Sequence, residues 1–222
     1  MKALFITFEG GEGCGKSTQA RLLYQRLKRR GIPALMTREP GGTRLGRLIR
    51  GLLKRQVTTS ISPEAELLLF NASRAQLVKE VIRPAFKKGM VVICDRFYHS
   101  TTAYQGYGRG LDLTIVKAIN DFAASGVRPD LTILLDIPPQ HGLDRKGYGT
   151  EDRFERETAR FHKRVRSGYL KLAKTEPERW LVIDGRLPRT EIARRIWQRV
   201  EGMLKVRHEK HVTTGTRPGR TD

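Results

Sequence analysis

A glycine-rich segment near the N-terminus has the composition of a phosphate-binding loop. Residues 10–17 read GGEGCGKS and match the pattern G-x-x-x-x-G-K-[ST], after an apolar run that predicts a strand and before a stretch with helical spacing. Backbone N–H groups of such a loop surround a phosphate, and the helix N-terminus adds its positive dipole. We expect Lys16 to reach the β- and γ-phosphates and Ser17 to bind Mg²⁺. The predicted ATP-binding residues are Gly10, Gly11, Glu12, Gly13, Cys14, Gly15, Lys16, Ser17 and Thr18.

Two further motifs bring cations to the same place. Arg38 begins the run REPGGT after a second predicted strand, and Asp95-Arg96 ends a third. The carboxyl ends of parallel strands meet at one edge of a sheet, where ligands bind. Asp95 suits the magnesium side, whereas the arginine after it is poorly suited to activate water and well suited to hold a second anion. For each arginine taken alone, the alternative is a surface ion pair of little energetic value.

Other classes of P-loop protein need residues that this sequence lacks. A GTPase requires an N-K-x-D run for base recognition, and the chain has none. A D-x-x-G run occurs at 144–147, but no apolar strand leads directly into it. The arginine at position 96 also argues against a hydrolysing ATPase, so the residues favour transfer of a phosphoryl group to a second phosphorylated molecule.

Two pairs of side chains could form a pocket for the base of that second molecule. Phe70 and Arg74 are four residues apart on a predicted helix and share a face, as do Thr101 and Gln105, with Tyr104 adjacent. Phe70 could stack on a base while Arg74 binds its edge or its phosphate. From spacing alone, a place in an ordinary hydrophobic core is the favoured interpretation of Phe70.

Four runs taken together resemble the thymidylate kinase family: residues 8–19 (FEGGEGCGKSTQ), 37–43 (TREPGGT), 95–97 (DRF) and 100–105 (STTAYQ). Their order and spacing agree over about residues 3–200, and the REPGGT run is the specific element. The resemblance implies transfer of the γ-phosphoryl group of ATP to dTMP, giving dTDP and ADP. It also implies Mg²⁺ dependence and a homodimer.

The resemblance assigns roles to individual residues. It implies that Phe70 stacks on thymine, that Arg74 and Gln105 address the edge of the base, and that Tyr104 lies under the deoxyribose. Arg38 and Arg96 would hold the acceptor phosphate, and Ser17 and Asp95 would lie at the metal. The predicted substrate-binding residues are Arg38, Glu39, Phe70, Arg74, Arg96, Ser100, Thr101, Tyr104 and Gln105. Thr101 departs from the asparagine that some members carry.

The family also divides by the position of an arginine that clamps phosphate, in the P-loop or in a mobile lid. The P-loop here carries Glu12, so the resemblance implies the bacterial-like type with the arginine in a lid at about residues 142–156. The candidates are Arg145, Lys146 and Arg153, and Arg153 is our choice because it follows the flexible stretch 147–150. The predicted catalytic residues are therefore Lys16, Asp95, Arg96 and Arg153.

Apolar runs and helical stripes alternate along the chain, which predicts a parallel sheet with helical crossovers. We expect strands at 3–8, 33–37, 90–94, 131–137 and 180–183, and helices at 16–30, from 43 to 53, 62–86, 97–105, 112–124 and 188–204, with a polar segment at 144–156 feeding a further helix. The fold class is a three-layer α/β P-loop NTPase fold with a five-stranded sheet and a small mobile lid. Residues 1–204 would form a single kinase domain, and 205–222 a basic, disordered tail.

The bulk composition limits the class of protein without choosing the reaction. The chain has 43 Lys and Arg against 23 Asp and Glu, a net charge of +20. This charge suits nucleic-acid binding as well as small phosphorylated ligands, so a nucleic-acid-stimulated P-loop ATPase and a monophosphate kinase of other base specificity remain alternatives, as does a kinase with added weak polyanion binding. Cys14 and Cys94 fit reduced thiols. We expect a cytoplasmic protein, because no signal peptide or apolar run of about 20 residues is present.

Overall fold

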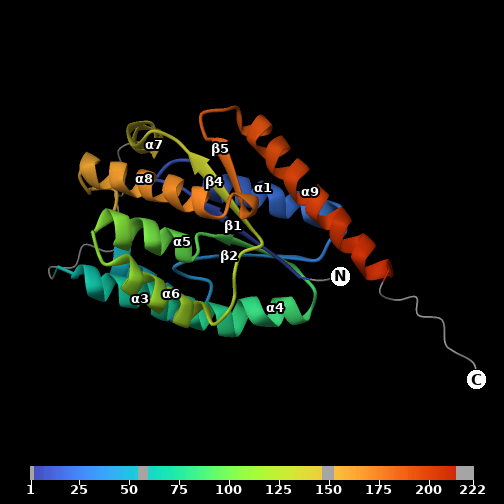
Figure 1. Cartoon of the computed structure of the whole chain (residues 1–222), viewed down its shortest axis with the longest axis horizontal. Helices are drawn as coiled ribbons and strands as arrows, with labels where there is room; N and C mark the ends of the chain where they lie inside the picture. The colour runs from blue at the N-terminus through green and yellow to red at the C-terminus, as the bar shows by residue number, and fades with distance from the viewer. Residues whose placement is uncertain (1–2, 55–59, 147–152, 214–222) are drawn as a thin grey trace, which may run out of the picture.

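A five-stranded parallel sheet forms the centre of the computed structural model, which describes residues 3–54, 60–146 and 153–213 (Figure 1). The strands are β1 (Leu4–Glu9), β2 (Ala34–Arg38), β3 (Val91–Asp95), β4 (Leu131–Asp136) and β5 (Trp180–Asp184). Their order in the sheet is β2-β3-β1-β4-β5, and every neighbouring pair is parallel. The expected strand ends lie within one residue of the observed ends. The predicted fold class is thereby confirmed.

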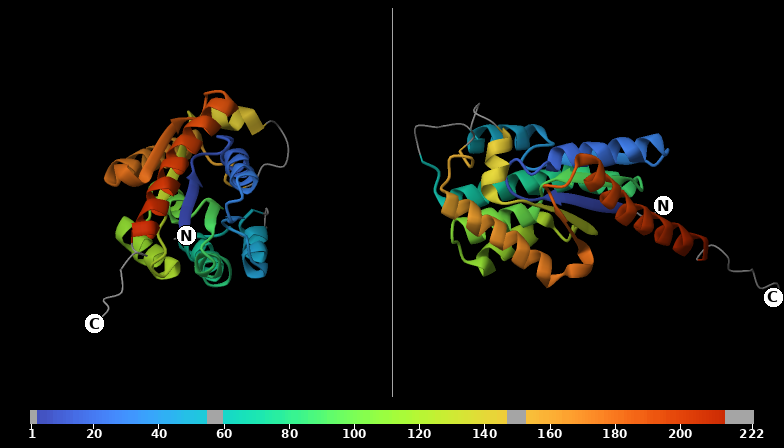
Figure 2. Two further views of the ribbon diagram at one scale, coloured as in Figure 1. Left: turned by 90° about the vertical axis from the view of Figure 1, so that its right-hand side faces the viewer. Right: turned by 90° about the horizontal axis from the view of Figure 1, so that it is seen from above.

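Strand β1 is buried along its whole length because helices cover both faces of the sheet. Leu4, Ile6 and Phe8 pack with the apolar residues of α1 (Lys16–Arg29) and α9 (Arg189–Thr213). The alternate residue Phe5 packs on the opposite face with α3 (Pro63–Leu77) and α4 (Arg83–Lys87). Figures 1 and 2 show α1 and α9 on one side of the sheet and α3 and α4 on the other.

The remaining helices complete the second layer or border it. They are α2 (Arg44–Lys54), η1 (Val78–Ile82), α5 (Tyr98–Thr101), η2 (Thr102–Gly108), α6 (Leu113–Ala124), α7 (Pro139–Lys146), α8 (Ala159–Thr175) and the short η3 (Pro177–Arg179). Helix α2 packs on α3. Both η1 and η2 are π-helical. The helix expected over 62–86 is therefore interrupted by a π-helical turn, and the one over 97–105 continues as a π-helix to Gly108.

Two helical segments differ from the sequence expectation. Helix α7 occupies 139–146, a stretch that we did not expect to be helical, and Pro139 suits its first turn, where no backbone donor is needed. Helix α9 continues to Thr213, nine residues past the expected end at 204, because no glycine or proline interrupts residues 205–213. Residues 214–222 of the expected tail and 147–152 of the expected lid lie outside the described residues. Within the described part of the chain, none of the helices is long and apolar enough to span a bilayer.

Every strand ends in a charged residue at the same edge of the sheet. Arg38 of β2 lies opposite Asp95 of β3, and Asp136 of β4 lies opposite Asp184 of β5, while Glu9 ends the central strand. Because all strands are parallel, this carboxyl edge also carries the segment 10–15 and the N-terminus of α1. The topology therefore gathers the candidate site residues at one edge.

Candidate active site

The phosphate-binding loop turns between β1 and α1 on three glycines in conformations that other residues rarely adopt. The φ angles of Gly10, Gly13 and Gly15 are 138°, 64° and 95°. Gly15 caps α1 without a side-chain hydrogen bond. The buried Lys16 Nζ donates to the carbonyl oxygen of Gly11 at 2.5 Å, so the lysine lies across the loop. This is the geometry of a P-loop.

Ser17 and Asp95 meet beside this loop, where the Ser17 hydroxyl donates to Oδ2 of Asp95. A hydroxyl and a carboxylate are oxygen ligands of the kind that Mg²⁺ accepts, with substrate phosphates and water as the remaining ligands. Among the described residues, no group of three or more His, Cys, Asp and Glu side chains gathers to hold a metal by itself. The pair therefore fits a divalent cation that arrives with a nucleotide.

Arg96 turns back from the end of β3 over the P-loop. Its φ of 73° lies in the left-handed region, which arginine seldom adopts. Nη1 donates to the carbonyl oxygen of Gly10 at 3.0 Å and to Ser100 Oγ at 3.1 Å, and Nη2 pairs with Glu12 Oε1 at 2.6 Å. The Tyr104 hydroxyl also donates to Glu12, at 2.7 Å. A strained backbone thus aims a guanidinium at the loop that is predicted to bind phosphate.

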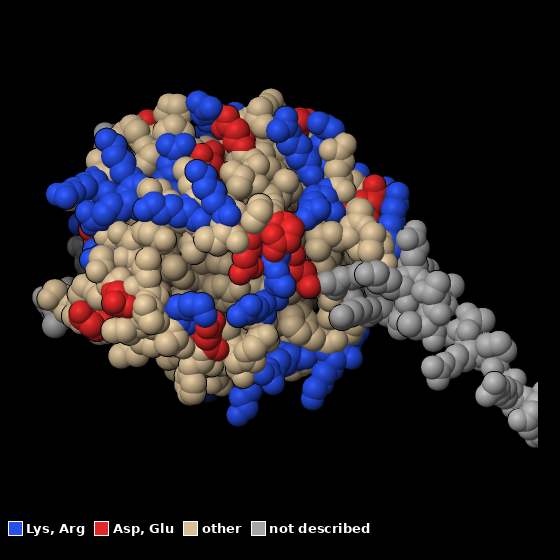
Figure 3. Space-filling model, in the orientation of Figure 1, with Lys and Arg blue, Asp and Glu red and all other residues tan. Residues whose placement is uncertain are grey.

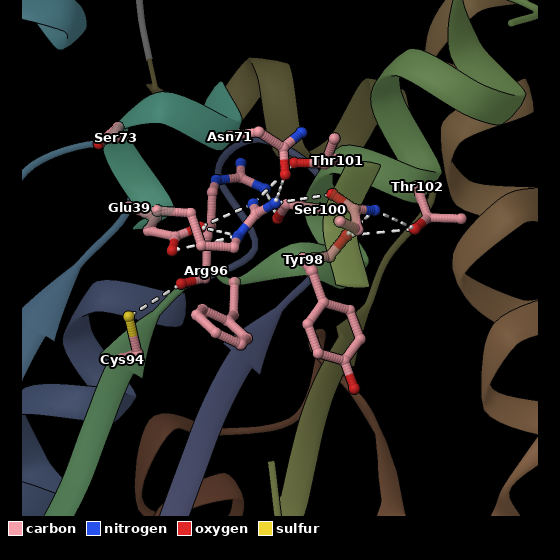
Figure 4. Close-up of polar contacts among 12 residues, drawn as sticks. Glu39, Asn71, Ser73, Cys94, Arg96, Tyr98, Ser100, Thr101 and Thr102 are labelled. Atoms are coloured by element: carbon pink, nitrogen blue, oxygen red, sulfur yellow. Dashed lines mark hydrogen bonds and ion pairs between the residues drawn. The ribbon is translucent and has the colours of Figure 1, made fainter. Parts of the chain in front are cut away.

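Arg74 lies at the centre of a second network, among the residues predicted to bind the second substrate. Its side chain is 1% exposed, and Nε and Nη2 donate to the Glu39 carboxylate at 2.9 and 2.7 Å. Nη1 and Nη2 also donate to Asn71, Asn120 and Thr101, at 2.7, 2.7 and 2.8 Å. Figure 4 shows Glu39, Asn71 and Thr101 directed toward one point. All the N–H donors of the Arg74 guanidinium therefore face protein acceptors.

Burial raises the pKa of two carboxyl groups at this edge. The pKa of Glu9 is raised to about 7, although Ser100, Arg96 and the backbone N–H of Phe97 favour its charged form. Burial also raises the pKa of Glu39, and the facing Arg74 opposes that shift. Glu9 accepts hydrogen bonds from Phe97 N at 2.9 Å and Ser100 Oγ at 2.5 Å. It thereby holds the turn that carries Arg96.

A cavity of about 390 Å³ joins these groups. It is lined by P-loop residues on one side and by the aromatic rings of Phe70, Tyr104 and Phe154 on the other. All nine predicted substrate-binding residues line it, as do six of the nine predicted ATP-binding residues, namely Glu12, Gly13, Gly15, Lys16, Ser17 and Thr18. The structure therefore brings the two halves of the predicted site together.

The lid candidates lie in different places. Arg145, on α7, lines the cavity and donates to the carbonyl oxygen of Gly185 at 2.8 Å. Arg153 instead donates to the buried carboxylate of Glu66, which also accepts from Gln105. Nothing is described for the side chain of Lys146. Arg145, which lines the cavity, is therefore a second candidate for the phosphate clamp beside the sequence-based choice of Arg153.

Four polar residues of the site, and the ring of Phe154, were not predicted from the sequence. Glu9, Arg50, Glu66 and Tyr169 had no predicted role, yet Arg50 lines the cavity and Tyr169 Oη lies 2.8 Å from Ser100 Oγ. Tyr169 lies on α8, and no motif marked that helix as part of the site. Glu9 was a recognisable signal, because a carboxylate that ends a buried strand needs partners.

One cavity that holds a P-loop, an arginine aimed at it and a separate aromatic pocket defines the class of P-loop kinases that phosphorylate nucleotides. Comparison with known proteins agrees. Residues 8–196 match the model of the family described as "Thymidylate kinase". A thymidylate kinase of Dehalococcoides mccartyi is 54% identical over 93% of this chain and 100% of its own length. One from Roseiflexus sp. is 48% identical over 91% and 95%.

A crystal structure of thymidylate kinase from Ehrlichia chaffeensis has a similar fold. Its TM-score is 0.74 at 34% identity, over 90% of this chain and 99% of that chain. The chain belongs to the thymidylate kinase family. The reaction of this family, transfer of the γ-phosphoryl group of ATP to dTMP with formation of dTDP and ADP, is the reaction of this chain.

Proposed function

We propose that the two sides of the cavity divide the substrates between them. ATP would place its β- and γ-phosphates on residues 10–18 and on Lys16, while dTMP would place its phosphate between Arg38 and Arg96 and its base beside Phe70. The observation that carries this assignment is the cavity itself, because one space of about 390 Å³ is lined by both sets of residues. It lets a donor and an acceptor phosphate meet in line without crossing the protein interior.

The acceptor phosphate needs no general base in this arrangement. Its second pKa is near 6, so an oxygen is already ionised at neutral pH. The obstacle is repulsion between two polyanions, which Lys16, Arg38 and Arg96 would offset as the transition state forms. Burial raises the pKa of Tyr104 well above its usual value, which keeps its hydroxyl protonated and donating to Glu12. Arg96 is thereby held facing the loop.

The divalent cation of this ATP-using enzyme would be Mg²⁺, held by Ser17 and Asp95. Bound with ATP, it would supply positive charge that offsets the negative charge of the phosphates. The fit rests on the Ser17–Asp95 contact described above. Asp95 orients the Ser17 hydroxyl through a direct hydrogen bond between the two side chains.

The base pocket would hold thymine between Phe70 and the donors and acceptors of η2. The centroid of the Phe154 ring lies 5.9 Å from that of Phe70 and 5.8 Å from that of Tyr104. Phe154, which belongs to the expected lid segment, would therefore close one side of the pocket. Thr101 Oγ accepts from Arg74, which leaves its own hydroxyl hydrogen to donate to the base. Arg74 would act on the base mainly by fixing Thr101, because its donors already face protein acceptors.

We assign the phosphate-clamping arginine of the lid to Arg145 in preference to Arg153. Arg145 lines the cavity together with Lys16, whereas Arg153 pairs with Glu66. Residues 1–204 would form the kinase domain with a lid at about 142–156. The basic segment 205–222, whose first nine residues continue α9, would have no role in the transfer, and the protein would act in the cytoplasm.

A homodimer would use the face formed by α2, α3 and α6. Leu48 and Leu52 on α2, Leu68 on α3, and Ile115 and Phe122 on α6 are exposed, Phe122 by 88%. These helices pack side by side, so the apolar residues belong to one surface. Figure 3 shows few charged side chains in the area that α3 and α6 occupy in Figure 1. Burying such a surface between two copies would remove it from water.

The basic surface suits an additional, weak affinity for polyanions that the reaction does not require. Helix α8 carries six cations and no acidic residue, and Figure 3 shows basic side chains in a row where this helix lies. Salt-dependent retention on heparin would support this affinity. Nucleic acid would remain dispensable for turnover.

A substrate panel tests the proposed function. ADP release is measured with ATP, Mg²⁺ and each of dTMP, dUMP and AMP, with and without single-stranded DNA. We expect rapid turnover with dTMP, slower turnover with dUMP, none above background with AMP, and no effect of DNA. ADP release that depends on DNA and not on a monophosphate would overturn the proposal.

A further inference from the structure

Glu66 is a fully buried acid beneath the base pocket. It lies in the first turn of α3, and its side chain is 0% exposed. Its carboxylate accepts from Gln105 Nε2 at 2.6 Å, from Arg109 Nε and Nη2 at 3.2 Å each, and from Arg153 Nη2. A buried carboxylate with this many donors is a built feature of the pocket, because burial without partners would be costly.

This carboxylate determines how the Gln105 amide is oriented. A carboxylate that receives two guanidinium groups acts only as an acceptor, so the amide must present its NH₂ group to Glu66. The Oε1 atom then points away from Glu66. Gln105 itself lines the cavity with Phe70 and Thr101, and no donor among the described residues meets Oε1. The pocket therefore offers an acceptor to the base at this point.

The polarity of that atom distinguishes pyrimidines. Thymine and uracil carry an N–H donor at N3, whereas cytosine carries a lone pair there. An acceptor at Oε1 matches the first two and repels the third. Rotating the amide to suit cytosine would turn Oε1 toward Glu66, where two acceptors would face one another without a proton between them. The free-energy cost of binding cytosine would thus arise at Glu66, which contacts Gln105 and not the base itself.

We propose that Glu66 is a positioning residue that sets the base specificity of the acceptor site by locking the Gln105 amide. This inference rests on the proposed placement of the base beside Gln105. Glu66 touches no substrate in this scheme. It acts through Gln105, and its pairs with Arg109 and Arg153 hold its carboxylate in place.

The test is Glu66→Gln, assayed with dTMP, dUMP and dCMP. A glutamine at 66 can either donate or accept, so the Gln105 amide becomes free to rotate. We expect the ratio of kcat/KM for dTMP to that for dCMP to fall roughly 10-fold or more, because an unmatched buried polar contact is removed. The ratio for dTMP to dUMP should stay unchanged, since both bases present the same edge at N3. Ratios taken on one preparation do not depend on the fraction of folded enzyme.

Glu157→Gln is the matched control. Glu157 pairs with the same Arg109, at 2.5 Å, and its pairing does not involve Gln105. It should leave the dTMP to dCMP ratio at the wild-type value. An unchanged ratio in Glu66→Gln, with wild-type enzyme that prefers dTMP, would overturn the inference and leave the proposed function standing. Wild-type enzyme without a preference for dTMP would instead overturn the proposed function.

Discussion

Gly13 of the P-loop and Gly142 of α7 meet backbone to backbone. A Cβ atom on Gly13 would lie 1.8 Å from the carbonyl oxygen of Gly142, and one on Gly142 would lie 2.1 Å from the carbonyl oxygen of Glu12. Neither position has room for a side chain, and backbone atoms on both sides cannot rotate away. The helix that leads into the expected lid therefore supports the loop that is expected to hold the phosphates.

Gly142→Ala should therefore displace the P-loop without altering any group that we expect to contact ATP. We expect kcat/KM for ATP to fall on the order of 10-fold to 100-fold, as for displacements of about 1 Å near reacting groups. Steady-state kinetics with varied ATP measures this. Gly202→Ala on α9, where an added Cβ meets nothing within 4 Å, is the control. Equal activity in the two variants would contradict a supporting role for Gly142.

Lys16→Ala removes the cation of the P-loop. The loss of one preorganised donor to developing charge lowers kcat on the order of 10²–10³. Lys28→Ala, on the exposed side of the same helix, should leave kcat unchanged. If purified, folded Lys16→Ala enzyme retained the wild-type kcat, the assignment of the ATP site would be wrong.

The two lid arginines should differ in which kinetic constant they change. Arg145→Ala should lower kcat roughly 10-fold or more, because it removes a cation that lines the cavity with Lys16. Arg153→Ala should chiefly raise KM for dTMP, since it loosens Glu66 beside the base pocket. Parallel kinetics with both substrates varied separates these effects. A larger loss of kcat in Arg153→Ala would restore the choice made from sequence.

Glu9 makes the stability of the fold depend on pH. Its pKa is about 7 in the folded protein against an ordinary value of 4.5, so the folded state binds its proton more tightly. The stabilising contribution is complete below pH 4.5 and is lost as pH rises to 7. From pH 5 to 8 the unfolding free energy of wild type should fall by about 2 to 3 kcal/mol relative to Glu9→Gln. Urea denaturation at both pH values measures the difference, and a constant difference would contradict the burial of a titrating Glu9.

Phe122→Asp tests the proposed dimer face. A carboxylate on this 88% exposed position of α6 would disfavour burial between two copies. We expect sedimentation to give a dimer for wild type and a monomer for the variant. Val182→Asp, at an exposed position of the edge strand β5, should remain dimeric. A monomeric wild type would overturn the proposed homodimer.

Local motifs allowed the fold and the phosphate side to be predicted. The P-loop is a continuous run between a strand and a helix, and Arg38, Asp95 and Arg96 end strands that must share one edge. Each strand could be located to within one residue because the strand residues are mostly apolar, and β1, β3 and β4 are buried along almost their whole length. Spacing alone therefore gave the sheet edge and the nucleotide loop.

Contacts between distant residues could not be predicted in this way. Tyr169 reaches Ser100 across 69 positions, and Glu66 reaches Arg153 across 87. An acid in the first turn of a helix, as at Glu66, already fits the helix dipole and gives no sign of a pocket. The choice between Arg145 and Arg153 depended on α7, whose helical conformation the polar sequence did not indicate.

The most direct test of the central claim follows the phosphoryl group itself. The enzyme is incubated with ATP labelled at the γ-phosphate, Mg²⁺ and dTMP, and the nucleotides are separated by anion exchange. If the chain transfers the phosphoryl group to dTMP, the label will appear in dTDP in proportion to the ADP formed. Label recovered only as inorganic phosphate would show hydrolysis in place of transfer and would contradict the account.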